Sequence, residues 1–426
     1  MGGDWVLSLQ LRYALHVRLL MAAQKNVLFV GAPGVGKTRL AREAARTVVE
    51  PVLVTGRDGL TYERLVAYYE KVNGGFQLSL GELSRAVISS WLLLACDLTP
   101  QHLVIDEINR CNVDVLLGET FTAMDIAHRM YVTVIRNEAY HLVVDVLERI
   151  SKGDKDAIKR LGLEEYIGYL GDMQKRVESL LNGFRRLGGI PFPYSFRILA
   201  TINIYDRANL YRVGWALQRR FATLYVVAPY EELKPKLAKE ELKKLENRLD
   251  KRVLDILQDP KSSVYGQAIR ELLADKKIEE SLVEADNPTM PVYVDETLVE
   301  NARNSIPGEY NDLFILVAYI YNIARQLRVE LGIAPLVDLA KLLLVYKVLN
   351  VEAIREDELV DLALSTLILP LLGVAAPRIR SELLLGASKG YQTIKKLQDT
   401  LASVLGSETL SARVVESYDL PHFTTS

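Results

Sequence analysis

Only two cysteines, Cys96 and Cys111, occur among the 426 residues of this chain. Two cysteines cannot build a disulfide framework, and free thiols fit a reducing compartment. Histidine is also scarce, and the five histidines are scattered without the spacing of metal ligands. A structural zinc site is therefore not expected.

An excess of charge of either sign is missing as well. Lysine and arginine total 52 residues, aspartate and glutamate total 54, and the formal net charge is −2 with a pI near 6.3. The molecule as a whole therefore has no basic field that would favour a nucleic acid partner. A local basic channel stays compatible with these numbers.

The two most apolar stretches are both interrupted. Residues 5–23 are broken by Arg12 and Arg18, which leaves no apolar core for a secretion signal. Residues 362–376 contain Pro370 and are short for a membrane span, so a buried helix is expected there. These features predict a soluble, cytoplasmic protein without a membrane partner.

Two adjacent carboxylates end one of the predicted strands. The run Leu103 to Ile105 is branched and apolar, as in a buried strand, and Asp106 and Glu107 follow it. Burying an ionised carboxylate is costly unless a cation or a hydrogen bond compensates it. The pair therefore marks either a ligand site at the strand end or an acidic, solvated end, and this stretch by itself does not separate the two.

A glycine-rich loop lies between a predicted strand and a predicted helix. The sequence NVLFV is β-rich, GAPGVGKT follows it directly, and a helix-forming stretch begins at Arg39. This order is the context of a phosphate-binding loop, in which glycines let successive N–H groups face phosphates at a helix N-terminus. The cofactor-binding residues predicted here are Gly31, Ala32, Pro33, Gly34, Val35, Gly36, Lys37, Thr38 and Arg39.

The loop suggests roles for the two carboxylates. Lys37 is expected to reach the β- and γ-phosphates, and Thr38 to ligate Mg²⁺ through its hydroxyl. Asp106 is then the second metal residue, and Glu107 orients and polarises the water that attacks the γ-phosphate. The alternative is a plain glycine turn with a solvated Lys37, which the agreement of motif and context disfavours.

A third polar strand end completes the predicted site. Asn203 follows the buried run RILATI, and it is expected to hydrogen-bond the same water or the γ-phosphate; a turn cap is the alternative. Arg219 and Arg220 end a predicted helix, from which a guanidinium would reach a phosphate of an adjacent subunit. For these arginines the alternative is a solvated helix end.

The chain resembles the AAA+ ATPases of the dynein-related type, in the branch that contains the McrB-like restriction motors and the MoxR-like ATPases. The motifs that carry the resemblance are DEINR, TYERLVAYY, the hairpin-like GGFQLSLGEL, INIYDR and ALQRRF. It covers Leu9 to Phe221, one insertion excepted, and continues more weakly to Gly373. It implies a hexameric ring with sites at subunit interfaces, in which Arg220 is the first choice and Arg219 the second for a finger supplied in trans. It also favours ATP as the nucleotide, with GTP as the alternative.

The sequence departs from these relatives in two places. Their lid carries an arginine where this chain has Leu336, and Arg325, Arg328 and Arg378 are the candidates to replace it. The insertion, at about 140–189, has helical apolar spacing with breaks at Gly153 and Gly162. In a ring it would lie near the pore, where it serves either substrate or partner contact or only packing.

We therefore predict an α/β fold: a P-loop NTPase parallel sheet sandwiched by helices (αβα), with an all-α C-terminal lid. The predicted domains are a nucleotide-binding core at 1–229, a helical lid at 230–375 and a C-terminal helical extension and tail at 376–426. A charged segment at 231–257 is expected to form one amphipathic helix, with a solvated face favoured over a nucleic-acid patch.

Three classes of function fit these features. The first is an McrB-like motor that moves DNA for a separate nuclease subunit, since the chain shows neither a DNA-reading domain before the loop nor a nuclease constellation. The second is a MoxR-like ATPase that remodels proteins, with a separate adaptor subunit. The third, a non-catalytic nucleotide-binding scaffold, is disfavoured by the complete set of site residues. DNA-stimulated turnover would favour the first class.

Overall fold

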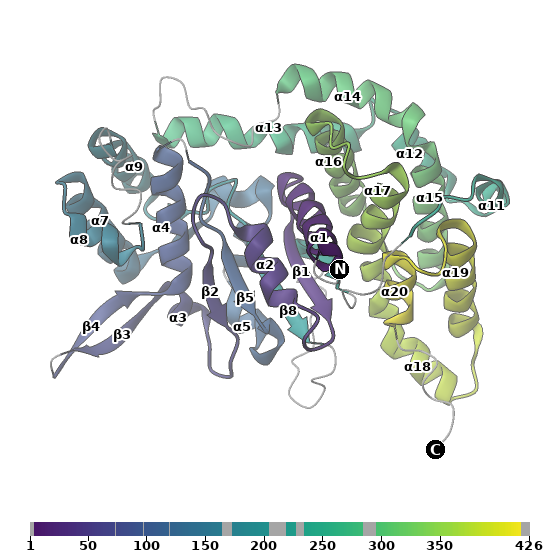
Figure 1. The fold of residues 1–426 in the computed structure, drawn as a ribbon, viewed down its shortest axis with the longest axis horizontal. Helices are drawn as coiled ribbons and strands as arrows, with labels where there is room; N and C mark the ends of the chain where they lie inside the picture. The colour runs from purple at the N-terminus through teal and green to yellow at the C-terminus, as the bar shows by residue number, and fades with distance from the viewer. Residues whose placement is uncertain are drawn as a thin grey trace. The chain divides into compact units, whose positions relative to one another are not determined.

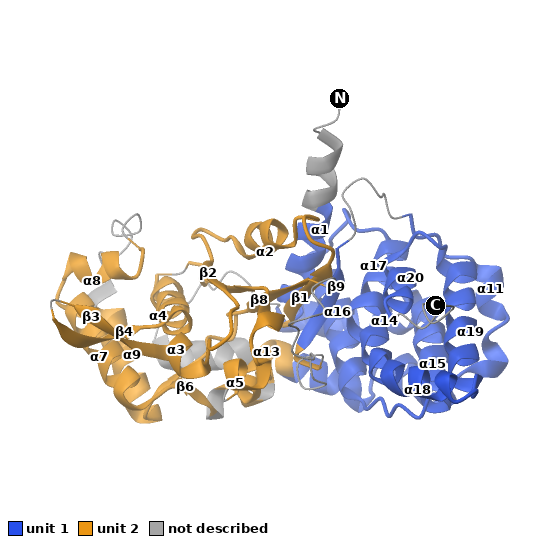
Figure 2. Ribbon diagram, turned by 90° about the horizontal axis from the view of Figure 1, so that it is seen from below, with its two compact units in different colours: residues 1–23, 221–270, 294–426 blue, residues 24–220, 271–293 orange. Residues whose placement is uncertain are grey.

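The computed structural model describes residues 4–72, 74–96, 98–118, 120–163, 173–203, 219–226, 234–283 and 295–418. The chain divides into two compact units (Figure 2). Unit 1 comprises residues 1–23, 221–270 and 294–426, and unit 2 comprises residues 24–220 and 271–293. The domain boundaries expected from the sequence stay a prediction.

A five-stranded sheet has the order β2-β5-β8-β1-β9. Its strands are β1 (Asn26–Gly31), β2 (Val52–Thr55), β5 (Leu103–Asp106), β8 (Ile198–Asn203) and β9 (Phe221–Tyr225). Strand β5 pairs in parallel with β2 and β8, and β8 pairs in parallel with β1. The three strands predicted from their apolar runs are confirmed, as is the parallel sheet.

The central strands are buried on both faces. Every residue of β1 is buried, as are the first five of β8 and the first three of β5, which is why their sequences are continuous apolar runs. Helices α2 (Lys37–Ala45) and α4 (Glu82–Ala95) pack on the sheet, and α2 lies on the side nearest the viewer in Figure 1. The remaining short helices of this part are α3 (Tyr62–Val66), η1 (Ile108–Arg110), α5 (Val113–Leu117), α6 (Thr120–Met124) and η2 (Ile126–Tyr131).

Two small hairpins extend unit 2. The first pairs β3 (Ala67–Val72) with β4 (Gly75–Leu80), so the hairpin expected from GGFQLSLGEL is present. The second pairs β6 (Thr133–Ile135) with β7 (Ile190–Pro191). In the described residues, the predicted insertion is helical and lies between these two strands.

Within its described residues, the insertion contains three helices. Gly153, at φ 83°, separates the first two, and Gly162, at φ 71°, follows the second, so both predicted breaks are confirmed. The first and third pack on each other, and the third also packs on α4 (Figure 1). Their bounds are α7 (Asn137–Ser151), α8 (Lys155–Arg160) and α9 (Met173–Leu187).

Unit 1 is helical apart from β9 in the part of it that the structure describes. Its core is built around α15 and α16, most of whose side chains are buried. Helix α13 (Ser263–Val283) begins in unit 1 and continues in unit 2. The other helices are α1 (Asp4–Ala22), α11 (Lys239–Lys243), η5 (Glu246–Arg248), α12 (Lys251–Gln258), α14 (Glu296–Glu309), α15 (Asn311–Gln326), α16 (Ala334–Leu349), α17 (Glu356–Ala363), η6 (Leu364–Ile368), η7 (Leu369–Ala375), α18 (Ala376–Leu384), α19 (Lys389–Leu405) and α20 (Leu410–Glu416).

The expectation of a single charged helix at 231–257 is wrong. The described part of this segment is broken into α11, η5 and α12. Asp250 causes the second break, because its carboxylate accepts the backbone N–H of Arg252 and caps α12, and it also pairs with Arg325. An aspartate side chain often accepts a backbone N–H and so starts a new helix. The spacing of apolar residues carries no signal for such a break.

The apolar stretch around Pro370 lies inside the protein. The continuous helical segment Glu356–Leu384 is long and apolar enough to cross a membrane by composition, but 89% of its most apolar window is buried. A π-turn at Leu364–Ile368 and a 3₁₀ turn at Leu369–Ala375 interrupt it, since proline lacks an N–H for the α-helical ladder. The expected buried helix is confirmed.

Candidate functional site

Polar residues from three motifs meet at one edge of the sheet. Gly31 at the end of β1 lies beside Asn203 at the end of β8, and Asp106 ends the other neighbour of β8. Parallel strands place their carboxyl ends at the same edge, where α/β proteins bind ligands. The expectation that Asn203 lies on the strand next to that of Asp106 is confirmed.

The glycine loop folds its lysine back over itself. Gly34 and Gly36 have φ of 77° and 88°, in the left-handed region, and Gly36 directly precedes α2. The side chain of Lys37 donates hydrogen bonds to the carbonyl oxygens of Gly31 at 3.0 Å and Ala32 at 2.5 Å. Only 8% of Lys37 is exposed, so the alternative of a solvated lysine is wrong.

Burial also affects the charge of this lysine. Desolvation lowers the pKa of Lys37, while the nearby negative charges of Asp106 and Glu107 oppose the shift. An ammonium held among carbonyl oxygens, with two carboxylates close by, would gain from a phosphate. The loop and its lysine therefore fit a bound polyphosphate.

One oxygen of Asp106 accepts hydrogen bonds from two hydroxyl groups. The hydroxyls of Thr38 and Thr201 each donate to Oδ1 of Asp106 at 2.6 Å. The hydroxyl of Thr38 uses its one proton in this bond, so its lone pairs stay available to a cation. Oδ2 of Asp106 can face the same ion or its water shell. Hydroxyl and carboxylate oxygens are the hard ligands that Mg²⁺ prefers, so these residues fit a magnesium ion.

Glu107 has an unusual backbone conformation. Its φ is 54° and its ψ is 47°, in the left-handed region that non-glycine residues seldom adopt. The backbone N–H of Glu107 donates to the hydroxyl of Thr201 at 2.9 Å. Its carboxylate pairs with Arg110 across 3.0 Å, and both side chains are partly exposed. The catalytic candidate is thus held through its backbone as well as its side chain.

Gly56, just after β2, makes room for this conformation. Its N–H donates to the carbonyl oxygen of Asp106 at 2.7 Å. A Cβ atom at this position would lie 2.3 Å from the carbonyl oxygen of Glu107. Thr201, Gly56 and Arg110 were not predicted as site residues, although Arg110 closes the DEINR motif and Thr201 lies within RILATI. The only signal for Thr201 is its place two residues before Asn203, on the same face of the strand.

The two predicted finger arginines lie away from this loop. Side chains at the start of β1, Lys25 and Asn26, donate to the carbonyl oxygens of Arg219 and Arg220, each at 3.4 Å. From Asn26 to Gly31 the strand covers about 17 Å, more than an arginine side chain spans. Neither guanidinium therefore reaches the phosphate loop of its own chain.

Arg220 is instead engaged with α6. Its Nε donates to the carbonyl oxygen of Phe121 at 2.6 Å, and the guanidinium lies 5.0 Å from the centre of the Phe121 ring. Burial lowers the pKa of Arg220, with Arg219 acting in the same direction and Asp125 opposing it.

The lid position that departs from the relatives is buried. Leu336, in α16, is 2% exposed, so it cannot contact a phosphate in the way the relatives' arginine does. Two of its candidate replacements are used within unit 1: Arg325 pairs with Asp250, and Arg378 donates to the carbonyl oxygen of Leu327. No replacement for the lid arginine is assigned.

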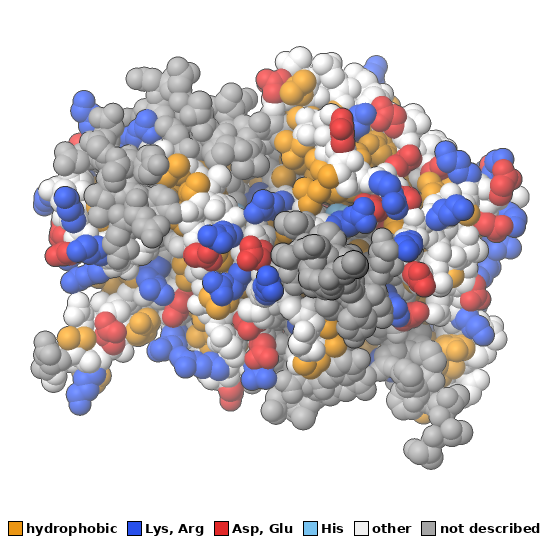
Figure 3. All heavy atoms as spheres, in the orientation of Figure 1, with side chains coloured by type: hydrophobic (Ala, Val, Ile, Leu, Met, Phe, Trp, Pro, Cys, Tyr) orange, Lys and Arg blue, Asp and Glu red, His pale blue; other side chains and the backbone are white. Residues whose placement is uncertain are grey.

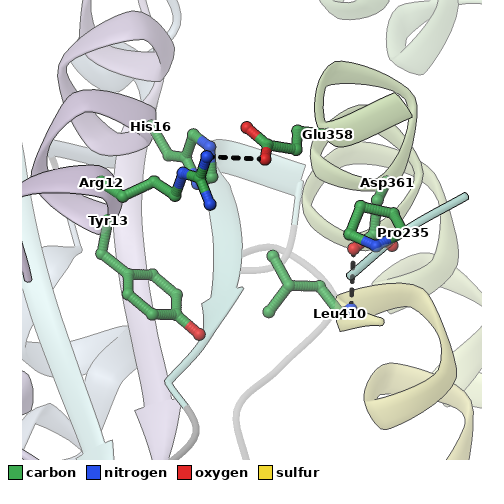
Figure 4. A pocket seen from close by; sticks show the side chains of 7 residues that line it. All are labelled: Arg12, Tyr13, His16, Pro235, Glu358, Asp361 and Leu410. Atoms are coloured by element: carbon green, nitrogen blue, oxygen red, sulfur yellow. Dashed lines mark hydrogen bonds and ion pairs between the residues drawn. The ribbon is translucent and has the colours of Figure 1, made fainter. Parts of the chain in front are cut away.

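Unit 1 also contains a small pocket (Figure 4). Its volume of about 30 Å³ has room for roughly two water molecules, which is far too small for a nucleotide. Within it Arg12 pairs with Glu358 at 3.0 Å, and the backbone N–H of Leu410 donates to Asp361 at 2.8 Å. Burial, helped by Arg12, lowers the pKa of His16 to about 4. The residues that line the pocket are Arg12, Tyr13, His16, Pro235, Glu358, Asp361 and Leu410.

Residues 26–221 match the family model of the AAA domain, dynein-related subfamily. The match covers 196 of the 426 residues, and this segment is similar to the ATPase domains of the AAA+ family. The matched segment contains the phosphate loop, the acidic pair, Asn203 and both arginines.

A solved structure from Cytophaga hutchinsonii, titled a "putative ATPase", is similar over 74% of this chain and 87% of its own, with 13% identity and a TM-score of 0.27. Likeness at this level does not bear on function. Among curated proteins, none matches the chain.

Proposed function

We propose that this ATPase works as a Mg²⁺-dependent hexameric ring motor that moves or remodels a macromolecule, as McrB-like motors do, in the cytoplasm. The observation that carries the proposal is the hydrogen-bonded group Thr38, Asp106, Thr201 and Glu107 beside the glycine loop. A phosphate loop, two metal residues and a second carboxylate are the parts that hydrolysis needs. They argue against a scaffold that only binds nucleotide.

The residues divide the work as follows. The loop from Gly31 to Thr38 binds the phosphates, and Lys37 exchanges its carbonyl partners for β- and γ-phosphate oxygens. Thr38 and Asp106 would hold the Mg²⁺, which would supply neutralisation of the charge that develops on the phosphate oxygens. Glu107 orients the attacking water and takes up its proton. Asn203 donates a hydrogen bond to that water or to the γ-phosphate.

Arg220 is the proposed finger, supplied to the phosphates of a neighbouring subunit, with Arg219 as the second choice. Support comes from the distance of about 17 Å between the two ends of β1, which separates both arginines from their own loop. A site that needs a cation beyond Lys37, and from which Arg219 and Arg220 of its own chain are too distant, is completed by another copy. A ring meets this need for every subunit.

The substrate is proposed to be DNA, on the resemblance of INIYDR and ALQRRF to McrB-like motors. One observation favours a protein substrate instead. Residues 140–189 contain nine basic and eight acidic residues, so the insertion lacks the basic excess that tracks phosphates. On the face drawn in Figure 3, basic and acidic side chains are likewise interspersed. A MoxR-like ATPase that remodels proteins is therefore the second candidate.

Stimulated turnover separates these candidates. We would measure Mg²⁺-dependent hydrolysis of ATP and GTP by the full chain alone, with double-stranded DNA and with an unfolded polypeptide. Stimulation by DNA is the expected result. Stimulation by polypeptide alone selects the MoxR-like function, and the absence of hydrolysis of either nucleotide under all conditions would leave only the scaffold.

A further inference from the structure

The hydroxyl of Thr201 joins the metal-binding carboxylate to the backbone of Glu107. It donates its single proton to Oδ1 of Asp106 at 2.6 Å and accepts the N–H of Glu107 at 2.9 Å. A hydroxyl has one proton and two lone pairs, so the bond to Asp106 turns the lone pairs toward the N–H of Glu107. The direction of one bond therefore determines the geometry of the other.

This link matters because the backbone of Glu107 is held in a costly conformation. A left-handed non-glycine residue persists only when its surroundings impose it. The contacts that hold it include the bond to Thr201 and a bond from the backbone N–H of Arg110 to the carbonyl oxygen of Glu107 at 3.0 Å. The missing side chain of Gly56 also admits that carbonyl oxygen. Without the bond to Thr201, the backbone can relax and carry the carboxylate with it.

We propose that Thr201 is a positioning residue for hydrolysis, which keeps Glu107 aimed at the attacking water and couples that aim to the metal carboxylate Asp106. The proposal rests on the role of Glu107 given above. Thr201 itself touches neither water nor phosphate in this scheme.

The competing explanation is packing. Thr201 is 1% exposed in the middle of the sheet, and a β-branched side chain packs well in a strand. Valine has nearly the same shape but no hydroxyl, and serine has the hydroxyl but lacks the methyl group. The two substitutions therefore separate the hydrogen bonds from the packing.

The test measures steady-state ATP hydrolysis and nucleotide binding for Thr201→Val and Thr201→Ser in the full chain. Thr201→Val should lower kcat by about 100-fold, the effect of a misplacement near 1 Å, with nucleotide affinity changed less than about threefold. Thr201→Ser should recover kcat to within about fivefold of the wild type. Gly56→Ala, which displaces the same backbone without removing the hydroxyl, should also lower kcat.

Controls keep the outcomes distinct. Ser90→Ala removes another buried hydroxyl, one that donates to Ala86 and Gln101 in and beside α4, and should leave kcat unchanged. Wild-type turnover in Thr201→Val, equal loss in Thr201→Ser, or full recovery of Thr201→Val at saturating Mg²⁺ would each overturn the proposal. Unchanged turnover in Glu107→Gln would instead refute the role of Glu107, whatever Thr201 does.

Discussion

At the residue scale, Lys37 and Glu107 are both held by contacts within the protein. Lys37 is folded over the loop by two carbonyl oxygens, and Glu107 has a left-handed backbone. For Glu107, a fixed backbone lowers the cost of organising the site at the moment of reaction. It also means that single substitutions should separate binding from hydrolysis.

We expect Lys37→Ala to lose tight triphosphate binding, because the loop then lacks the cation that contacts the β- and γ-phosphates. Glu107→Gln should keep binding while hydrolysis falls by about 100-fold or more, since an amide cannot accept the proton of water. Fluorescent-nucleotide titration and phosphate release measure the two effects. Normal turnover in Glu107→Gln would remove this residue from its role.

A second residue-scale prediction concerns pH. Burial, followed by the charges of Arg197 and Arg129, lowers the pKa of His102 to about 3, whereas an unfolded histidine titrates near 6.5. The unfolded chain therefore binds the extra proton between these values, and stability is full above pH 6.5 and falls as the pH drops. Each pH unit lost in this window costs about 1.4 kcal/mol from this group.

The test for His102 is its replacement by asparagine. Its Nδ1 accepts the backbone N–H of Arg197 at 3.2 Å, and the side-chain oxygen of Asn offers an acceptor that does not titrate. His102→Asn should therefore flatten the decline in urea midpoint between pH 7 and pH 5. His128→Asn, at an exposed position, is the control, and an equally steep decline in His102→Asn would contradict the prediction.

At the scale of elements, the helical insertion is built on a hairpin. Helices α7 to α9 lie in the chain between β6 and β7, and these two strands pair with each other. Phe184 of α9 packs against Trp91 of α4, with ring centres 5.7 Å apart. The insertion is thus held by the β6–β7 pair and by its packing against α4. Segments added to a fixed scaffold often carry function.

Replacing residues 137–187 by a short turn between β6 and β7 should spare basal hydrolysis within about twofold, because the site residues lie on β1, β5 and β8. Stimulation by the macromolecular substrate should be lost. Since the deletion exposes Trp91, a second variant with Lys155→Glu and Lys159→Glu on α8 tests the same surface with the packing intact. Full stimulation in both would mean that the insertion only packs.

At the scale of the whole molecule, the proposed finger is supplied by a second copy of the chain. The arginines lie beside the start of β1, and the phosphates are expected at its end. A finger in trans is worth on the order of 10³ in turnover. Hydrolysis should therefore depend on assembly.

Arg220→Ala should bind nucleotide normally and hydrolyse it at least 100-fold more slowly. Mixing it with Lys37→Ala should restore part of the activity, because some interfaces then pair an intact loop with an intact finger. Turnover of the wild type should fall on dilution as the ring dissociates, monitored by light scattering. Constant turnover down to a demonstrated monomer, with no rescue on mixing, would refute the ring.

The sequence by itself determined the parts of the site that local patterns encode. A β-rich run, eight loop residues and a helix make a phosphate loop without help from the rest of the chain. Apolar runs that end in Asp106 and Asn203 mark strand ends, and parallel strands bring such ends to one edge. The helical nature of the insertion and its breaks at Gly153 and Gly162 were equally local.

The tertiary structure alone decided the contacts between residues far apart in the chain. Thr201 meets Glu107 across 94 positions because β8 lies beside β5, and no periodicity in either strand encodes that neighbour. The close approach of Gly56 and the cap at Asp250 likewise depend on partners that the spacing of apolar residues does not report. Local propensity selects the elements, whereas burial and hydrogen bonding among distant segments select which side chains face each other.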